Sequence, residues 1–277
     1  MKIGFFITGR LKSSRLKRKV LLDLNGKTLI DRVIERAKKV NGIDGVVLCT
    51  STNPQDSELY KNALLNNIQF YAGSEDDVLQ RLYSAARYYG YDAFLSITAD
   101  NPLHSFYYGS KILDISLKNN FDFIFPDGLP LGIAPYYIKT DALDVAVKMK
   151  KKTYTEVWGP FVNRPDFFNI CNLKITSHTL NPSTTRLTCD YQEDYQNLIQ
   201  IYSNFNKNHN PSIFEIEKLI NENEQIGIKN NSIQQLTIPP DILSEIKKDF
   251  DLAIELGKDI INQNGYKISP GHKCIEI

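Results

Sequence analysis

The densest group of charged side chains in this sequence lies near its N-terminus, in the stretch GRLKSSRLKRK over residues 9–19. Six of the ten positions from Arg10 to Lys19 are lysine or arginine, side chains that bind phosphate oxygens through charge-assisted hydrogen bonds. From the residues alone, three interpretations are open: a solvated surface run, a nucleic-acid patch and a polyphosphate cradle. The run directly follows a five-residue apolar segment, Ile3 to Ile7. A loop straight after a buried strand is where α/β proteins bind ligands, which favours the phosphate cradle.

Two aspartates follow apolar segments much later in the chain. Asp100 stands in ITADNP and Asp190 in RLTCDYQED. A single aspartate after a strand is often only a turn residue, and Asp190 can also cap the helix that follows it. Two carboxylates together with many cations at one sheet edge, however, fit the binding of a nucleoside triphosphate with Mg²⁺. The carboxylates would bind the metal, and the metal would bridge phosphate oxygens. Neither GxxxxGK[ST] nor GxGxxG occurs, so the sequence predicts neither a P-loop nor a dinucleotide site.

These residues need a scaffold that brings them together. The first 125 or so residues alternate apolar, strand-like runs with segments of helical spacing. This alternation predicts an α/β fold with a doubly wound, mostly parallel sheet. The loops after parallel strands then share one edge of the sheet. The predicted strands are 2–8, 45–51, 68–73, 92–100 and 121–128, and the predicted helices are 28–40, one from Pro54, one opened by Ser74 and the acids after it, and 105–120.

The pattern is less regular after Gly128. Further strands are predicted over 132–140, 167–175 and 184–190, and helices over 140–152, 191–205, 212–223 and 240–263. We expect an α/β domain over residues 1–206 and a helical C-terminal extension of unknown role over 207–277.

Composition excludes several classes of protein. A net charge of +1 and a pI near 7.6 argue against a general nucleic-acid binder, which carries a broad basic excess. The apolar N-terminal run is too short for a signal peptide or a membrane span. The four cysteines and four histidines lack metal-ligand spacing, and we expect reduced thiols in a cytoplasmic protein.

The basic stretch also resembles a known family. GRLKSSRLKRKVLLDLNGKTLIDRVIERAKK is similar to the opening of the cytidylyltransferases that activate sugar acids, such as acylneuraminate and Kdo. It is most similar to their spore-coat polysaccharide biosynthesis branch, with a pattern like Q-A-R-M-G-S-T-R-L-P-G-K-V-L followed by G-K-P-L. The matching positions are Arg10, Ser13, Ser14, Arg15, Leu16, Lys19, Val20, Leu21, Gly26, Lys27 and Leu29.

Further similar segments follow in the family's order, so that the resemblance covers about residues 2–206. They are TSTNPQD, GSEDDVLQRLYSAA, ITADNPL, FPDGLPLGI and TRLTCDYQEDYQNLIQIY.

The resemblance implies a Rossmann-like nucleotidyltransferase that transfers CMP from CTP to a sugar acid or sugar phosphate and releases pyrophosphate. It implies a nucleotide site with Gly9, Arg10, Ser13, Ser14, Arg15 and Lys19 at the phosphates and Thr98 with the Gly73–Ser74 turn near the base. Asp100 and Asp190 would bind Mg²⁺, and the catalytic set would be Arg15, Lys19, Asp100 and Asp190. Acceptor candidates in residues 126–175, where the family also places a homodimer contact, are Tyr136, Glu156 and Arg164.

The basic loop departs from the family pattern in its glycines and its proline: Gly9 replaces an alanine, Lys12 a glycine, and Lys17 and Arg18 a Pro-Gly pair. Losing two glycines and a proline at these positions changes which backbone shapes the loop adopts. Two alternatives therefore stay open: a transferase that uses another nucleotide or a nucleotide sugar, and a non-catalytic nucleotide-binding protein.

Overall fold

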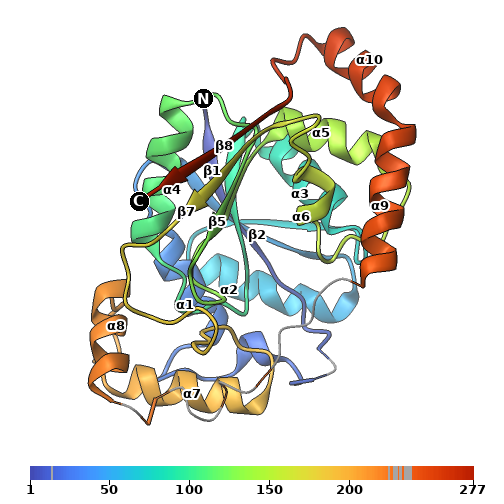
Figure 1. Ribbon diagram of the computed structural model, residues 1–277. Coiled ribbons are helices and arrows are strands. Elements are labelled where there is room, and N and C mark those ends of the chain that lie inside the picture. Colours follow the sequence, from blue (N-terminus) through green and yellow to red (C-terminus); the bar gives the residue numbers. More distant parts are fainter. Residues whose placement is uncertain (14, 224, 227–229, 231–232, 234–238) are drawn as a thin grey trace.

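The computed structural model spans residues 1–277 and describes all of them except 14, 224, 227–229, 231–232 and 234–238. Among the described residues, a sheet of eight strands runs in the order β3-β2-β1-β4-β6-β5-β7-β8 (Figure 1). Only β6 is antiparallel to its neighbours β4 and β5 within this sheet, and the other strand pairs are parallel. The predicted α/β fold with a mostly parallel sheet is confirmed. The strands are β1 (Ile3–Thr8), β2 (Gly45–Ser51), β3 (Gln69–Gly73), β4 (Ala93–Thr98), β5 (Phe123–Asp127), β6 (Tyr136–Lys139), β7 (Asn169–Lys174) and β8 (Gly271–Glu276).

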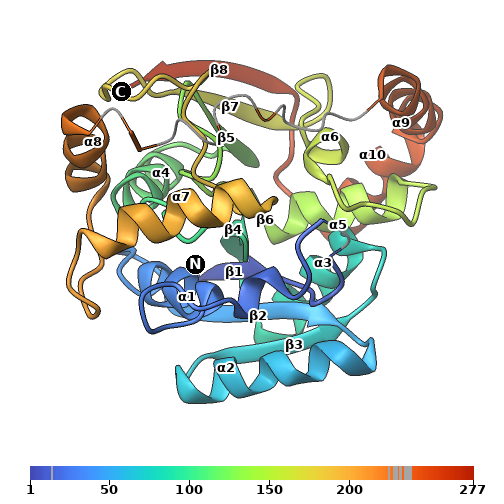
Figure 2. The same ribbon diagram turned by 90° about the horizontal axis from the view of Figure 1, so that it is seen from below.

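Helices cover both faces of the sheet because successive strand residues point to opposite sides. In β1, Phe5 and Ile7 pack into one core and Phe6 into the other, and Figure 2 shows the two layers of helices on either side. The first core is covered by α1 (Leu29–Ala37), α2 (Leu59–Leu65), α4 (Phe106–Lys118), α7 (Gln192–Ser203) and α8 (Ile213–Glu222). The second is covered by α3 (Val78–Tyr89), α5 (Thr140–Met149), α6 (Gly159–Val162), α9 (Pro240–Leu252) and α10 (Ile254–Asn264).

Several helix starts follow from local side-chain chemistry. Thr28 caps α1 by accepting a hydrogen bond from the backbone N of Asp31. Asn53 caps a 3₁₀ turn, η2 (Pro54–Glu58), that has Pro at its first position and leads into α2. Helix α3 is capped by Asp77 rather than by the predicted Ser74, whose Oγ instead accepts a hydrogen bond from the backbone N of Asp77.

Three predicted elements differ from the structure. The segment 184–190 forms no strand and keeps only an isolated bridge between Leu131 and Arg186. The long predicted C-terminal helix is two helices, because the backbone leaves the helical conformation at Ala253. The C-terminal segment also contributes β8, a strand that the sequence did not predict. Because β8 pairs in parallel with β7 from Asn169–Gly271 to Lys174–Glu276, residues 207–277 include the edge of the sheet as well as helices.

No helix in the described part of the chain is both long and apolar enough to cross a membrane.

Candidate active site

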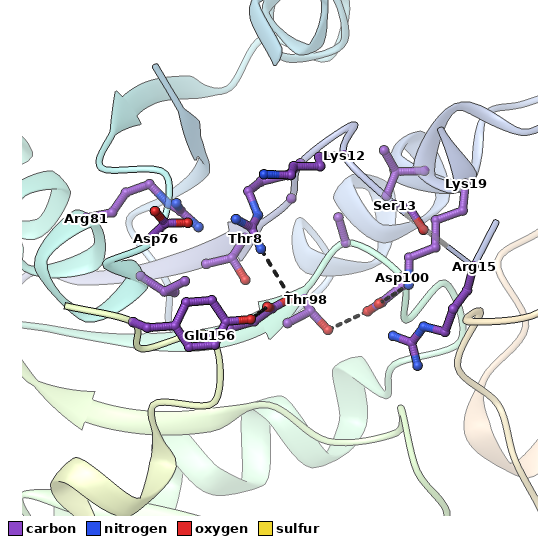
Figure 3. A pocket seen from close by; sticks show the side chains of 16 residues that line it. Thr8, Lys12, Ser13, Arg15, Lys19, Asp76, Arg81, Thr98, Asp100 and Glu156 are labelled. Carbon is purple, nitrogen blue, oxygen red and sulfur yellow. Dashed lines mark hydrogen bonds and ion pairs between the residues drawn. The ribbon is translucent and has the colours of Figure 1, made fainter. Parts of the chain in front are cut away.

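The carboxyl ends of β1 and β4 meet beside a cavity of about 320 Å³. Strand order reverses here, since the chain runs from β1 outward to β2 and β3 and then returns to β4 on the other side of β1. Such a switch point is where open α/β sheets bind ligands. Figure 3 shows the basic loop after β1 on one side of the cavity and the end of β4 on the other. The cavity lining includes Arg10, Ser13, Arg15, Lys19, Thr98 and Asp100.

The loop after β1 is fixed at its start by hydrogen bonds to β2 and to the turn η2. The backbone N of Gly9 donates to the carbonyl of Cys49 (3.1 Å), and that of Leu11 donates to Oδ1 of the buried Asp56 (2.7 Å). A Cβ on Gly9 would lie 2.8 Å from the Cβ of Ala99. The alanine of the family pattern therefore does not fit here unless this neighbour moves, and glycine lets the loop pass close to the end of β4.

Lys19 lies at the centre of the charged residues of the site. Its Nζ is 2.6 Å from Oδ2 of Asp100 and 2.9 Å from Oδ1 of Asp190. The structure thus brings both predicted metal ligands to one ammonium, although they are far apart in the sequence. Burial alone lowers the pKa of Lys19, but the charges and hydrogen bonds of the two carboxylates outweigh burial and raise this pKa above its ordinary value.

Two arginines also donate to the carboxylate of Asp190. Arg186 donates to Oδ2 (2.7 Å) and Arg15 to Oδ1 (3.0 Å). The Arg15 guanidinium also lies over the ring of Tyr191, 5.2 Å from its centroid. Burial raises the pKa of Asp190, but the nearby cations, Lys19 foremost, outweigh it and hold this pKa below its usual range. Asp190 therefore stays ionised in the absence of any ligand.

Behind Asp190 lies a buried support that the sequence did not reveal. Asp194, on the first turn of α7, accepts hydrogen bonds from the backbone N of Asp190 (2.9 Å) and of Tyr191 (3.0 Å). Its other oxygen accepts from Nε of Arg186 (2.8 Å). Arg186 and Asp194 both stand in the RLTCDYQED segment, four residues on either side of Asp190, but residue spacing does not indicate that they pair with each other.

Asp100 is oriented by a chain of hydrogen bonds at the end of β4. The amide nitrogen of Asn101 donates to the hydroxyl of Thr98 (2.6 Å), which in turn donates to Oδ1 of Asp100 (2.5 Å). The other carboxylate oxygen is thereby left to Lys19. Thr98, expected near the base, directly contacts a carboxylate in this structure.

The opposite end of the cavity is formed by the turn after β3. Arg10 donates to the carbonyl of Glu75 (3.0 Å) and pairs with the carboxylate of Glu156 (3.1 Å). Arg81, from α3, donates to the carbonyls of Ser74 and Glu75. Two guanidinium groups thus bind the backbone carbonyls of this turn.

The remaining predicted site residues fall in different places. Ser14 lies outside the described residues, and Ser74 does not line the cavity. Glu156 lines this cavity and a second one next to it, and Tyr136 lines the second cavity only. Arg164 lines neither, because it pairs with Asp166 and Asp251 (2.6 Å each); we propose that it anchors α9. The predicted homodimer stays a prediction.

The loop positions that depart from the family pattern have distinct environments. Lys12 pairs with Glu75 (3.1 Å), and Lys17 is exposed. Arg18 has φ 51° and ψ 31°, a left-handed conformation that favours glycine, and its side chain pairs with Glu58. Arg18 therefore keeps the backbone shape that the glycine of the family pattern would adopt without strain.

The donor set fits a divalent cation that arrives with a triphosphate. The described residues contain no cluster of three or more acidic, histidine or cysteine side chains able to hold a metal alone. Two carboxylates converge at Lys19 instead, and Mg²⁺ is typically bound by one or two carboxylates with phosphate oxygens and water. Arg10, Lys12, Arg15 and Lys19 supply the cations that a triphosphate needs.

Comparisons with known proteins agree with this geometry. The cytidylyltransferase family profile matches residues 5–233. An uncharacterized protein of Methanocaldococcus jannaschii is 32% identical over 237 residues, which is 85% of this chain and 97% of that protein. The spore coat polysaccharide biosynthesis protein SpsF of Bacillus subtilis is 25% identical over 232 residues, 80% of this chain and 95% of that protein.

A solved structure shows the same fold. A cytidylyltransferase from Leptospira borgpetersenii superposes with a TM-score of 0.76 at 26% identity, over 85% of this chain and 100% of that one. With most of the chain matched by the family profile and the charged residues assembled at the switch point, the chain belongs to the cytidylyltransferase family and is a nucleotidyltransferase that uses CTP.

Proposed function

We propose that this protein transfers CMP from CTP to a sugar acid or a sugar phosphate, with release of pyrophosphate, for the synthesis of a surface polysaccharide or glycan. The observation that carries the proposal is the convergence of Lys19, Asp100 and Asp190 at the end of the β1 loop. The name of the Bacillus subtilis relative supports the polysaccharide context.

In this proposal the triphosphate lies along the β1 loop. Arg10, Arg15 and Lys19 bind its phosphate oxygens and stabilise the negative charge that develops on the leaving pyrophosphate. Lys19 and Arg15 then exchange carboxylate partners for phosphate partners, which leaves Asp100 and Asp190 free to hold Mg²⁺. When bound, the metal neutralises charge at the α-phosphate and makes it a better electrophile.

The acceptor oxygen attacks the α-phosphorus, and the bond from that phosphorus to the oxygen bridging to the β-phosphate breaks. Where the attacking oxygen belongs to a hydroxyl group, its proton passes to solvent water. The electron pair leaves with pyrophosphate. The protein contributes mainly position and charge, because phosphoryl-type transfer needs little covalent help from side chains. Thr98 keeps the carboxylate of Asp100 in place during the reaction.

An assay of pyrophosphate release tests the proposal. The protein is incubated with each of the four nucleoside triphosphates, Mg²⁺ and a panel of sugar acids and sugar phosphates. We expect release with CTP, and a loss of about 10²-fold or more in Asp100→Asn and Asp190→Asn. Release with another triphosphate instead of CTP would favour a related transferase. CTP binding without release would favour a non-catalytic nucleotide-binding protein.

A further inference from the structure

One edge of the sheet, formed by β8, pairs with another strand on one side only. Strand β8 is the last in the sheet order and lies next to β7, and Figure 2 shows it as the outermost element at that end of the sheet. It also lies beyond residues 5–233, which the cytidylyltransferase profile matches. This edge therefore belongs to a part of the chain that the family profile does not cover.

The hydrogen bonds between β7 and β8 show which backbone groups of β8 point away from the sheet. The backbone N of Ile277, just after β8, donates to the carbonyl of Lys174 in β7 (3.0 Å). Because successive residues of a strand turn their N–H and C=O groups to alternate sides, the odd-numbered residues of β8 face β7. The backbone groups of His272, Cys274 and Glu276 therefore point outward, and within the described part of the chain no hydrogen bond engages them.

The opposite edge of the sheet, formed by β3, is partly covered. The carbonyl of Phe70 in β3 accepts a hydrogen bond from the hydroxyl of Tyr89 (2.6 Å). The ring of Tyr60, from α2, packs edge to face on the ring of Phe70 with centroids 5.4 Å apart. An uncovered edge offers its backbone groups to a strand of another chain, so β8 is the edge of this sheet that suits such pairing.

The side chains of β8 leave its edge accessible. His272, Lys273, Cys274 and Glu276 are exposed, and the Glu276 side chain remains 61% exposed although Lys174 lies 3.8 Å from its carboxylate. A basic side chain thus lies near the start of the strand and an acidic one at its end. Such a strand is complementary to a copy of itself that runs in the opposite direction, because the basic start of one strand meets the acidic end of the other.

We propose that two copies of this protein associate through β8, in antiparallel pairing about a twofold axis at Cys274. In this register the outward backbone groups of Cys274 pair with those of Cys274 in the second copy. Those of His272 pair with those of Glu276 in the second copy, and the reverse pair repeats the contact, as a twofold axis requires. The two sheets then form one continuous sheet across the axis.

Charge favours this register over its neighbours. Pairing about Cys274 places the imidazole of His272 opposite the carboxylate of Glu276 twice, and it places Lys273 opposite Ile275, which the lysine stem can cover. Sliding the second copy by two residues in one direction brings Lys273 opposite Lys273. Sliding it in the other direction leaves His272 outside the paired strands. Only the register centred on Cys274 uses all three outward-facing residues of β8.

The contact is small, so the dimer is weak and reversible. Two strands of six residues each should bury less than the ~1,200 Å² at which stable interfaces begin, and we expect a Kd on the order of 10 µM. This contact is separate from the one that the family resemblance places in residues 126–175. It does not depend on the proposed transferase function.

Sedimentation of the full-length protein from about 1 to 300 µM measures the association, and Cys274 reports the register. Cys274 is exposed, whereas Cys49, Cys171 and Cys189 are buried. Directly opposite residues in a hydrogen-bonded antiparallel pair have Cα atoms about 5.5 Å apart, within the span of a disulfide. We expect a concentration-dependent dimer, and a Cys274–Cys274 disulfide, identified by peptide mass spectrometry, when copper phenanthroline oxidises it.

Variants separate the backbone contact from the charges. Cys274→Pro removes an N–H that does not face β7, so the monomer should stay folded by circular dichroism while the dimer weakens at least tenfold. Cys274→Ser should remove the cross-link and keep the dimer. His272→Lys should tighten the dimer and His272→Glu weaken it, each about threefold or more, because both face Glu276 of the second copy. Gln263→Glu, at an exposed position of α10, is the matched control and should leave Kd unchanged.

The proposal is overturned if the wild-type protein stays monomeric up to about 300 µM. It is also overturned if the Cys274→Pro variant dimerises with the wild-type Kd, because the dimer contact then lies elsewhere, as in residues 126–175. Should Cys274→Pro fail to fold, the two His272 variants decide the question. Opposite shifts of their Kd values support the pairing, and equal Kd values overturn it.

Discussion

The ammonium nitrogen of Lys19 lies 2.6 Å from Oδ2 of Asp100, one of the two carboxylates that we propose to bind Mg²⁺. The same nitrogen contacts Asp190 at 2.9 Å. In the protein without nucleotide, the positive charge between the two carboxylates thus comes from a side chain. Lys19 and a divalent cation would neutralise the same charges, so in the proposed mechanism we expect them to compete for these carboxylates and a triphosphate that attracts Lys19 to relieve the competition.

The first prediction concerns metal binding without nucleotide. Lys19→Met removes the competing ammonium, so Mn²⁺ should bind about tenfold or more tightly to the variant than to the wild-type protein in the absence of CTP. CTP itself should bind more weakly because one phosphate contact is lost. Electron paramagnetic resonance of free Mn²⁺ measures the first effect and calorimetry the second. Lys17→Met, which removes an exposed lysine of the same loop, is the control. Equal Mn²⁺ affinities of the wild-type protein and both variants would refute the competition.

The second prediction concerns the left-handed residue of the loop. Arg18→Gly removes the strain of a Cβ at φ 51° and should stabilise the fold by about 0.5–1 kcal/mol, since the strain relieved exceeds the extra chain entropy of glycine. Arg18→Ala loses the same surface contact with Glu58 but keeps the Cβ, and so isolates the backbone effect. Urea denaturation of both variants measures the difference, and an Ala variant as stable as the Gly variant would show that the strain relieved does not exceed the extra chain entropy of glycine.

The third prediction concerns the support behind Asp190. Asp194 is fully buried and accepts hydrogen bonds from Arg186 and from two backbone N–H groups. Asp194→Asn should therefore destabilise the protein by about 3 kcal/mol, because a buried charged network loses its acceptor. It should also lower kcat, because Asp190 loses its backbone anchor. Glu193→Gln, at the exposed neighbouring position, should change neither the stability nor kcat. Urea denaturation measures the stability, and an Asp194→Asn variant as stable as the wild type would show that the network contributes little.

The fourth prediction is a pH dependence of stability caused by His104. This ring is fully buried beside Phe5, and its Nε2 lies 3.0 Å from the carbonyl of Val33. Burial, with a smaller effect of the Arg36 charge, lowers the pKa of His104 to about 3. The unfolded chain binds a proton at the ordinary histidine pKa of about 6.5 while the folded chain does not, so stability falls as the pH drops from 6.5 toward 3, by about 1.4 kcal/mol per pH unit.

A substitution isolates this contribution from those of other groups. The stability of His104→Gln, measured by denaturation at several pH values between about 4 and 7, should lack this slope. Its difference from the wild type should change steadily below pH 6.5 and be constant above it. Parallel curves over the whole range would show that His104 titrates normally in the folded protein.

Much of the fold was predictable because the first five strands are continuous apolar runs, each followed by a turn or a helix with a recognisable start. Asp100 was identified for the same reason, since it directly follows such a run. Strand β8 was missed because GHKCIE is polar and mostly exposed at the edge of the sheet, where neither an apolar run nor alternation is required. Arg186 and Asp194 were matched to the family without a role, because their pairing depends on a loop conformation that residue spacing does not reveal.

The acceptor candidates show the same limit. Tyr136, Glu156 and Arg164 were equivalent in the sequence, as polar or aromatic residues of one segment. Only the structure separates Arg164, which pairs with Asp251 of α9, from Tyr136 and Glu156, which line cavities at the site. Side-chain partners from distant segments decide this, and a single sequence does not contain them.

The central claim, transfer of CMP to a small acceptor, is tested most directly by product analysis. The protein is incubated with isotopically labelled CTP, Mg²⁺ and a small-molecule extract of the source cells, and labelled products are identified by mass spectrometry beside an Asp100→Asn control. We predict a CMP conjugate of a sugar, together with pyrophosphate, that the wild-type protein forms and the control does not. Tight CTP binding without any labelled conjugate or pyrophosphate would contradict the transferase function.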